Sequence, residues 1–383
     1  MIKWLATRHH VDLFAHSEVR RNLADDPLRR CLRRVDVVKV NRRSPGLAER
    51  VATLTEVLSP IGRPYKYARY HSEYIQRRLL KFIGEQRYDI VLWVFFDFRN
   101  VLDLVKTRLR GARILYDSID SPYLHYIREP RVRGIKRLVR AMDVWKTRRW
   151  ENFLLNSVDL GAYTTALDAA ASGGGGTPVA IIPNGIYLGE DRLPLSKPSS
   201  PHSIGFLGNM GYRPNVEATL RLYEKVFVPL SAEFEGLRLV IIGRSPAPEV
   251  VLLRGGDVEV TGTVESIWPH IARVGVFVYP MNTGAGLQNK VLEAMHAGKP
   301  VVTTEICAKS IGARDGDEIL IGRTDEELRY HARMLLENPD YAREIGLRGK
   351  TYVDRTFELE SVLLKFERFL FSDGVSKKLS GTS

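Results

Sequence analysis

Residues 276–302 form the feature that most restricts how this chain can fold. An apolar strand segment leads into a glycine-rich turn, and a helical segment with Glu293 in its second turn follows. A Gly-Lys-Pro turn and a β-branched strand segment come next, which is the order of a strand–helix–strand unit. Gly284 and Gly286 have no Cβ atom, so the backbone there can approach a ligand closely. The free N–H groups of the helix start favour a phosphate, and Glu293 could accept hydrogen bonds from a ribose.

The same order of elements also occurs in α/β proteins that bind no ligand at this place. On this segment alone, an ordinary strand–loop–helix therefore stays open as the alternative to a ligand site.

Length and composition place the chain among soluble proteins of two domains. It has 383 residues, of which 44% are hydrophobic and 27% are charged. No apolar run approaches the roughly 18 residues of a membrane span, and the N-terminus shows no signal-peptide pattern. Cys31 and Cys307 are the only cysteines, and they lie too far apart for a metal-binding motif. We therefore expect a cytoplasmic protein in a reducing compartment.

The positive charge is large and concentrated in two stretches. The formal net charge is +12, and the sequence pI is about 9.6. Basic residues crowd residues 29–43 and again residues 131–149. The chain has no zinc-finger spacing and no RNP-type aromatic motif, so we expect no nucleic-acid partner. The basic helix predicted over residues 132–156 favours association with an anionic membrane on the inner face, and a plain solvated face is the alternative.

The N-terminal half alternates strand-like and helical segments, which predicts a parallel sheet covered by helices. A helix is expected over 66–84. In the basic helix, Ile135, Leu138, Val139, Met142 and Trp145 line one face. The predicted strands are 10–15, 35–40, 88–96, 112–120, 158–165 and 178–185.

The C-terminal half repeats this organisation after a stretch rich in proline and serine. Residues 189–202 are typical of an interdomain linker. A last amphipathic helix is expected over about 357–371. The predicted strands of this half are 203–208, 237–243, 258–262, 274–280, 301–304 and 318–322.

The detailed wording of the glycine turn and its helix resembles a known signature. It is similar to the donor-site signature of family 4 glycosyltransferases, the glycosyl transferases group 1, and among these to sugar transferases of bacterial exopolysaccharide biosynthesis. The matching positions are Gly284, Gly286, Lys290, Val291, Leu292, Glu293, Ala294, Met295, Gly298, Lys299, Pro300, Val301 and Val302. Residues 181–187, 205–218 and 260–280 also resemble segments of this family.

The resemblance implies an α/β protein of the GT-B fold, in which two Rossmann-like, doubly wound domains face a cleft. An acceptor-side domain would span 1–195, and a domain that binds the nucleotide-sugar donor would span 196–356. Residues 357–383 would hold a helix that crosses back to the first domain, followed by a frayed tail. The implied activity is a retaining, metal-independent transfer of a sugar to a glycan or lipid-linked acceptor, without a cofactor.

The resemblance also implies which residues bind the donor. They are Gly208, Asn209, Arg213, Arg244, Val264, Gly284, Gly286, Leu287, Gln288, Lys290 and Glu293. Many family members have a second glutamate eight positions before the one matched by Glu293, and Ala285 stands there instead. The contact to the transferred sugar is therefore either absent or made by backbone N–H groups of Gly286, Leu287 and Gln288. Arg213, Arg244 and Lys290 are the candidates for neutralising the diphosphate, and a solvated Arg244 is the alternative.

In the first domain, Asp117 and Asp120 are the catalytic candidates. Both lie at or just beyond the end of a predicted strand, where ligands of open α/β sheets gather. Many family members have a histidine in this region, and Asp120 is our substitute for it. The alternative is that Asp120 caps the next helix.

By the same resemblance, the usual first strand and its glycine-rich loop would lie before Met1. We expect either a misassigned start, with about 20–25 residues missing, or a diverged form, and we favour the missing segment. Two other functions stay open, a non-catalytic GT-B scaffold or partner subunit and a sugar-nucleotide epimerase.

Overall fold

The computed structural model describes residues 1–17, 27–39, 55, 59, 72–94, 99–128, 134, 136–173, 175–187, 202–283 and 286–372. Contacts divide the chain into two compact units. The first unit comprises Met1–Tyr163, Ala169–Ala180 and Lys365–Ser383, and the second comprises Thr164–Asp168 and Ile181–Leu364. Residues 189–201 of the predicted linker lie outside the described residues. Parallel sheets with flanking helices occur in both units, which confirms the α/β fold class.

The second unit contains a six-stranded sheet in the order β12-β11-β10-β7-β8-β9, with parallel pairing throughout. All six strands predicted for this half are confirmed, each one to three residues shorter than expected. Their carboxyl ends meet at one edge, and the strand order reverses beside β7. The strands are β7 (Ser203–Leu207), β8 (Arg238–Ile242), β9 (Val258–Val260), β10 (Val276–Tyr279), β11 (Val301–Thr303) and β12 (Leu320–Ile321).

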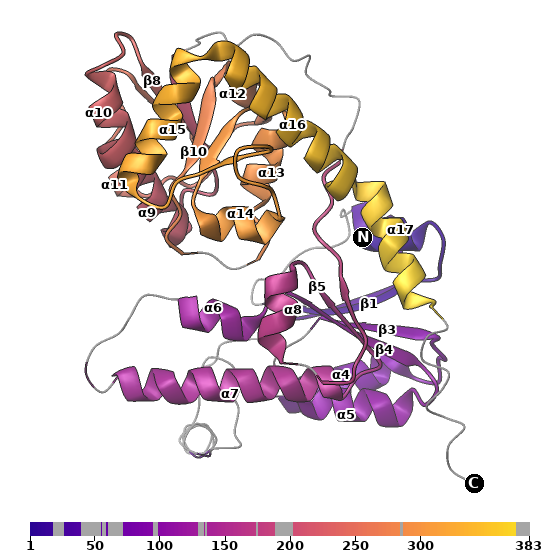
Figure 1. Cartoon of the computed structure of the whole chain (residues 1–383). Helices are drawn as coiled ribbons and strands as arrows, with labels where there is room; N and C mark the ends of the chain where they lie inside the picture. The colour runs from indigo at the N-terminus through magenta and orange to yellow at the C-terminus, as the bar shows by residue number, and fades with distance from the viewer. Residues whose placement is uncertain are drawn as a thin grey trace. The chain divides into compact units, whose positions relative to one another are not determined.

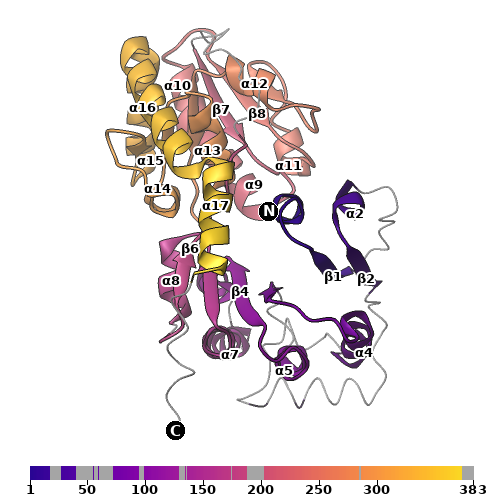
Figure 2. The same ribbon diagram turned by 90° about the vertical axis from the view of Figure 1, so that its right-hand side faces the viewer.

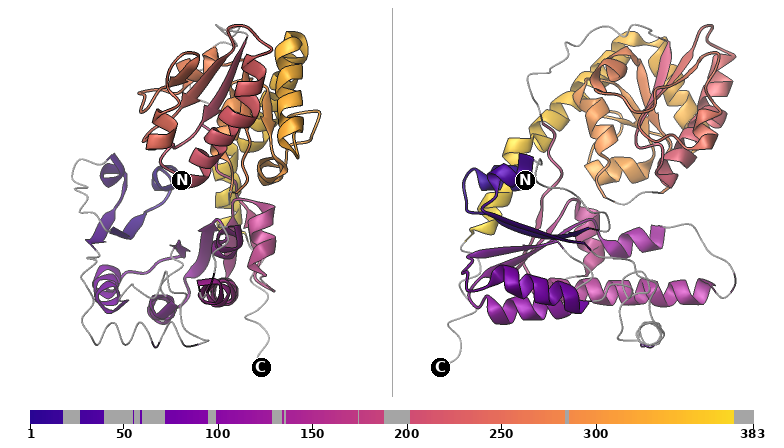
Figure 3. Two further views of the ribbon diagram at one scale, coloured as in Figure 1. Left: turned by 90° about the vertical axis from the view of Figure 1, so that its left-hand side faces the viewer. Right: turned by 180° about the vertical axis from the view of Figure 1, so that it is seen from behind.

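Helices lie on both sides of this sheet (Figures 1 and 3). The helical elements of this half of the chain are α9 (Arg213–Leu222), the π-helical η1 (Tyr223–Phe227), α10 (Val228–Ser231), α11 (Pro248–Val251), α12 (Trp268–Arg273), α13 (Asn289–His296), α14 (Glu305–Ile311), α15 (Asp325–Glu337), α16 (Pro339–Phe357) and α17 (Leu359–Leu370). The division between the two units falls within α17, after Leu364.

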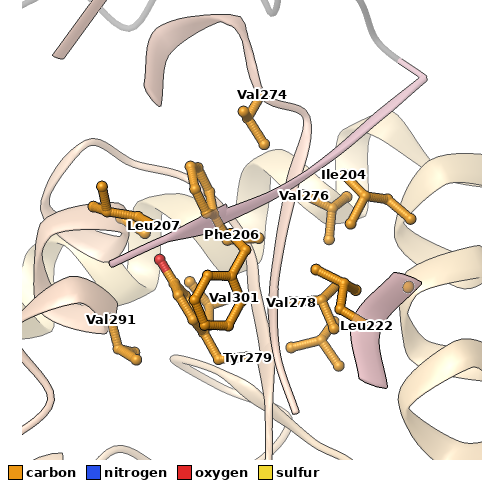
Figure 4. Packing of buried hydrophobic residues seen from close by; sticks show 14 of the residues in the cluster. Ile204, Phe206, Leu207, Leu222, Val274, Val276, Val278, Tyr279, Val291 and Val301 are labelled. Carbon is orange, nitrogen blue, oxygen red and sulfur yellow. The ribbon is translucent and has the colours of Figure 1, made fainter. Parts of the chain in front are cut away.

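The core of the second unit explains why its strands are nearly continuous apolar runs. A parallel sheet covered on both faces buries successive side chains of each strand. Phe206 of β7 and Tyr279 of β10 are fully buried, with ring centroids 5.3 Å apart. Figure 4 shows them among the valines and leucines of neighbouring elements. Burying each such side chain stabilises the fold by about 1.5–3 kcal/mol, so the strand ends carry their loops on a rigid base.

The sheet of the first unit is in two described pieces (Figure 2). Strands β1 (Asp12–Ser17) and β2 (Arg34–Lys39) form a parallel pair. The other piece has the order β3-β4-β5-β6. Among the described strands, β1 bonds only to β2, and β3 bonds only to β4. The strands of the second piece are β3 (Ile90–Trp93), β4 (Arg113–Ile119), β5 (Leu160–Tyr163) and β6 (Val179–Ile181).

The basic helix of the first unit begins later than predicted, and its apolar face is exposed. Of the apolar residues expected on one face, Leu138, Val139 and Trp145 are 72%, 43% and 48% exposed. The side of α7 (Lys136–Asn156) that is buried carries Lys146, Thr147 and Glu151 together with Trp150 and Leu154. The remaining helices before β6 are α1 (Ile2–Ala6), α2 (Pro27–Cys31), α4 (Ser72–Ile83), α5 (Arg99–Arg108), α6 (Pro122–Arg128) and α8 (Ala166–Ser172).

None of the helices in the described parts of the chain is both long and apolar enough to span a bilayer.

Candidate functional site

Two loops at the carboxyl edge of the second unit's sheet are fixed to each other. The loop after β7 and the loop after β8 exchange backbone hydrogen bonds, from Met210 N to Arg244 O at 2.9 Å and from Ala247 N to Met210 O at 3.1 Å. Gly243 has a φ of 153°, and a Cβ atom there would lie 1.7 Å from Gly208 O. Only glycine permits this approach. The two loops therefore present one preformed surface at the strand ends.

The two arginines predicted to neutralise a diphosphate differ in how they are engaged. The guanidinium of Arg213 lies 2.9 Å from a carboxylate oxygen of Glu217 and 2.9 Å from one of Glu249. These two carboxylates hold the pKa of Arg213 above its usual value and already balance its charge. Arg244 is exposed, and no ion pair is recorded for its side chain within the described residues. Of the two, Arg244 is the cation that is open to an anionic ligand.

Asn215 lies inside helix α9 and not at its start. Helix α9 begins two residues earlier, and the Asn215 side chain is 5% exposed inside its first turn. Its Nδ2 donates to Asn209 O at 3.0 Å, while its Oδ1 accepts from Lys290 Nζ at 2.9 Å. Asn215 thus joins the loop after β7 to the first turn of α13, a contact between residues 75 positions apart.

Lys290 is a cation at the positive end of a helix. It lies in the first turn of α13, which contains no acidic residue. Its two recorded hydrogen-bond acceptors, Asn215 Oδ1 and Gln288 Oε1, are neutral amide oxygens at 2.9 Å. Burial lowers the pKa of Lys290, and nearby Cys307 and Glu293 partly offset this. A cation at a helix N-terminus is opposed by the helix dipole, and an anion beside it would relieve this repulsion.

Glu293 lies one turn further along the same helix and is half-buried. Burial raises its pKa to about 7, and Lys290 lowers it in part. Below it, the hydroxyl of the fully buried Tyr279 donates to Lys290 O at 2.9 Å. The tyrosine thereby fixes the backbone between the two charged side chains. A carboxylate held this way can accept hydrogen bonds from neighbouring hydroxyl groups of a ligand.

The segment that leads into the glycine turn is held by side chains that the sequence did not single out. Thr304 Oγ1 donates to Met281 O at 2.8 Å. The guanidinium of Arg221 on α9 donates to Pro280 O at 3.0 Å and to Asn282 Oδ1 at 2.6 Å, and it pairs with Asp325 at 2.6 Å. No local pattern marks these residues, because they act over 23 to 104 positions of sequence.

The remaining predicted donor residues lie on the same edge or outside the described part. Gly286 has a φ of 70°, the left-handed region that favours glycine, and Leu287 behind it is half-buried. Asn209 is exposed, and its Oδ1 accepts from Gly211 N at 3.1 Å. Val264 lies in the loop after β9. Gly284 and Ala285 lie outside the described residues.

In the first unit, Asp117 and Asp120 lie three positions apart in the turn that ends β4. Burial raises the pKa of Asp117, and the backbone N–H of Ile119, which donates to it at 3.3 Å, partly offsets this. Ile119 adopts a left-handed φ of 59°. The cap of α6 is formed by Ser121 rather than by Asp120, because Ser121 Oγ accepts from Leu124 N at 3.1 Å.

His296 has a structural partner. Its Nδ1 lies 2.5 Å from Asp354 on α16, and its ring packs edge-on against Trp268. Within the described residues, no group of three histidine, cysteine or carboxylate side chains is arranged to hold a metal ion.

Comparison with known proteins identifies the domain that carries the donor-side residues. Residues 201–338 match the family described as glycosyl transferases group 1. This match lies within the second unit and includes β7 to α13. A comparison with the sequences of curated proteins finds no match.

Solved structures match most of the chain at low identity. Anabaena Alr3699/HepE in complex with UDP is 13% identical, with a TM-score of 0.64 over 96% of this chain and 94% of that chain. Sucrose-phosphate synthase from Thermosynechococcus elongatus is 15% identical, with a TM-score of 0.63 over 96% and 89%. TarM of S. aureus is 12% identical with a TM-score of 0.60, and the match covers 76% of this chain but 57% of TarM. These likenesses establish the fold, which is GT-B.

Proposed function

We propose that this chain, a group 1 glycosyltransferase of the GT-B fold, transfers a sugar from a nucleotide-sugar to a glycan or lipid-linked acceptor. The observation that carries the proposal is Lys290. It is a cation at a helix N-terminus whose recorded hydrogen-bond partners are both neutral. A diphosphate supplies the negative charge that this position lacks.

In this proposal the second unit binds the donor. Lys290 and the N–H groups at the start of α13 bind the diphosphate, and Arg244 adds charge from the loop after β8. Glu293 in its ionised form accepts hydrogen bonds from the ribose. As the glycosidic bond breaks, negative charge grows on the departing diphosphate, and Lys290 stabilises that charge. The preformed loops hold the donor in one orientation, which removes much of the entropic barrier.

The proposed reaction retains the configuration of the sugar. The bond from the anomeric carbon to the phosphate oxygen breaks, and the acceptor oxygen bonds to the same face of the sugar. The acceptor proton passes to an oxygen of the leaving phosphate, which departs as a nucleoside diphosphate. We assign Asp117 and Asp120 of the first unit to the acceptor hydroxyl. We expect no metal ion to be needed.

The ligands of similar solved structures suggest which nucleotide to test first. HepE has been solved with UDP, with UDP and glucose, and with UDP-glucose. The pneumococcal O-GlcNAc transferase GtfA has been solved with UDP and GlcNAc. We therefore propose a UDP-sugar as the donor and exopolysaccharide synthesis as the process.

We also propose that α7 places the protein on an anionic membrane surface. The exposed side of α7 combines Leu138 and Trp145 with Arg137, Arg148 and Arg149, a set that we call the α7 basic face. The acidic residues of the helix, Asp143 and Glu151, are both buried, at 7% and 0% exposure. Exposed apolar side chains among arginines favour the interface of an anionic bilayer, where a lipid-linked acceptor would be found.

Titration with nucleotides tests the proposed donor site. Purified wild-type protein and the variant Glu293→Ala are titrated with UDP, GDP, ADP and dTDP in a calorimeter. We expect the wild type to bind UDP most tightly and the variant to bind it more weakly. If a folded wild-type protein binds none of the four, the chain is a scaffold rather than a transferase. If it binds UDP-glucose but converts it to another UDP-sugar without transfer, it is an epimerase.

A further inference from the structure

The turn after β4 contains a backbone conformation that its sequence disfavours. Ile119 has a φ of 59°, although a β-branched side chain strongly opposes the left-handed region. The pairing of β4 with β5 also shifts register between Asp117 and Ile119. Such an outlier persists only where the surroundings hold it in place, and outliers of this kind concentrate at functional sites.

Hydrogen bonds within the turn hold its shape from one side. Ser118 Oγ lies 2.8 Å from Asp120 O, and Asp120 N donates to Ser118 O at 2.6 Å. Ile119 N donates to Asp117 Oδ1 at 3.3 Å. The Ile119 side chain is 44% exposed, so its own packing contributes little to holding the strained conformation.

A buried carboxylate holds the turn from the other side. Glu151 on α7 is 0% exposed. Its Oε2 accepts from Ser121 Oγ at 2.9 Å and from Tyr123 N at 3.2 Å, and its Oε1 accepts from the hydroxyl of Tyr163 at 3.2 Å. Glu151 thus ties the first turn of α6 to the last residue of β5.

We infer that Glu151 is a positioning residue, which holds the strained turn of residues 117–121 so that Asp117 and Asp120 can orient an acceptor hydroxyl. This inference rests on the proposed glycosyl transfer and adds the element that fixes its acceptor side. A buried carboxylate is an expensive way to join two elements, since well-packed apolar side chains often stabilise as much. The buried carboxylate of Glu151 is accounted for if its contribution is the geometry of the turn rather than stability.

Two variants separate a positioning role from a structural one. Glu151→Gln keeps the size of the side chain but replaces one acceptor oxygen with a donor. Ile119→Gly removes the strain, because glycine adopts the left-handed region freely. Asp159→Asn is the matched control, since the Asp159 carboxylate accepts from Ile114 N at the opposite end of β4, at 2.8 Å.

The assay uses UDP-glucose as donor and the p-nitrophenyl glycoside to which the wild type transfers fastest. UDP affinity and melting temperature are measured in parallel. We expect Glu151→Gln to lower kcat/KM for the acceptor by about tenfold or more, while UDP affinity stays within about twofold. Ile119→Gly keeps the left-handed conformation of the turn, so its kcat/KM should stay within about twofold of the wild type. Ile119→Gly should at the same time raise the melting temperature. Asp159→Asn should lower the melting temperature without changing KM for the acceptor.

A folded Glu151→Gln variant with wild-type acceptor kinetics would overturn the inference, as would parallel losses of stability and activity in Ile119→Gly. A wild type that binds UDP-glucose and transfers to no glycoside in the panel would instead contradict the proposed function itself.

Discussion

The donor-side loops of the second unit and the turn after β4 in the first unit are anchored by different means. The loops after β7 and β8 are joined by backbone hydrogen bonds and by the neutral side chain of Asn215. The turn after β4 is strained and is tied to a buried carboxylate. The hydrogen-bond acceptors of Lys290 are neutral amide oxygens, which leave its charge available to a ligand. In the turn after β4, we infer that the buried Glu151 keeps the backbone in an unfavourable conformation.

The difference teaches where each unit is sensitive to change. A site built on neutral anchors loses function when its ligand-facing charge is removed. A site built on a strained turn loses function when the contact that holds the turn is removed. Four predictions on the donor loops, the α7 basic face and the carboxylate of Glu293 test this comparison.

Lys290→Met should have the largest effect. The variant keeps the length of the side chain but removes the charge beside the proposed diphosphate, so UDP affinity should fall about 50-fold, as for loss of a charged hydrogen bond. Isothermal titration measures it. Arg213→Met is the control, because Arg213 is already paired with Glu217 and Glu249, and affinity should change less than about twofold. Equal losses of UDP affinity in both variants would show that existing ion pairs do not decide which basic residue binds the diphosphate.

Charge reversal on the α7 basic face should have the next largest effect. Each basic residue near an anionic surface contributes about 1 kcal/mol, so Arg148→Glu with Arg149→Glu should weaken vesicle binding about 30-fold or more. Sedimentation with vesicles of phosphatidylcholine and phosphatidylserine measures it. Arg108→Glu with Arg110→Glu makes the same charge change at the exposed end of α5 as a control. Identical losses from both pairs would indicate attraction by net charge rather than a specific face.

Arg221→Met should have an intermediate effect on the donor side. The variant removes the hydrogen bonds to Pro280 O and Asn282, which hold the segment before the glycine turn. KM for UDP-glucose should rise about tenfold, because misplacement of a binding loop is costly. Asp325→Asn, which removes the ion pair of Arg221 but leaves both loop contacts, should raise KM less. A larger effect of Asp325→Asn would place the anchor in the ion pair rather than in the loop contacts.

Sequence alone predicted much of the fold because apolar strands of a covered parallel sheet are legible as continuous runs. All six strands of the second unit were identified this way, from residues such as Phe206 and Tyr279 that are fully buried. The predicted strands are one to three residues too long, because apolar residues continue past the last hydrogen bond between neighbouring strands. Periodicity predicts the apolar stripe of α7 but not that the stripe is exposed, because it does not say which face of a helix is covered.

Less of the candidate site can be predicted from the sequence. The resemblance points to Lys290 and Glu293, which share a helix, but no sequence pattern joins Asn215 to them. Its contact with Lys290 spans 75 positions and leaves no local signal. The ion pair of Arg213 with Glu249 is invisible for the same reason. The strain at Ile119 has no counterpart in composition or spacing, because it arises from the contacts of a whole turn.

The smallest expected effect is a gain in stability on the donor side. The pKa of Glu293 is raised from 4.5 to about 7 in the folded protein. Ionising it there is therefore harder than in the unfolded chain, so stability falls as pH rises from about 4.5 to about 7 and stays lower above that. Glu293→Gln removes this cost and should stabilise the fold at pH 8 by about 2 kcal/mol, or about 4 °C in melting temperature. Near pH 4.5 the variant and the wild type should melt alike.

The same variant should bind UDP more weakly at pH 8, because its amide accepts fewer hydrogen bonds from the ribose than the carboxylate does. Stability and UDP affinity would then change in opposite directions. Glu217→Gln, an exposed carboxylate of the same unit, is the control and should show no such gain. If Glu293→Gln melts lower than the wild type at pH 8, the carboxylate stabilises the fold, and the proposed cost of its burial is wrong. A cost found at Glu293 as well as at Ile119 would mean that both units give up stability at or beside the residues proposed to bind a ligand, and that they differ in how the surrounding loops are held.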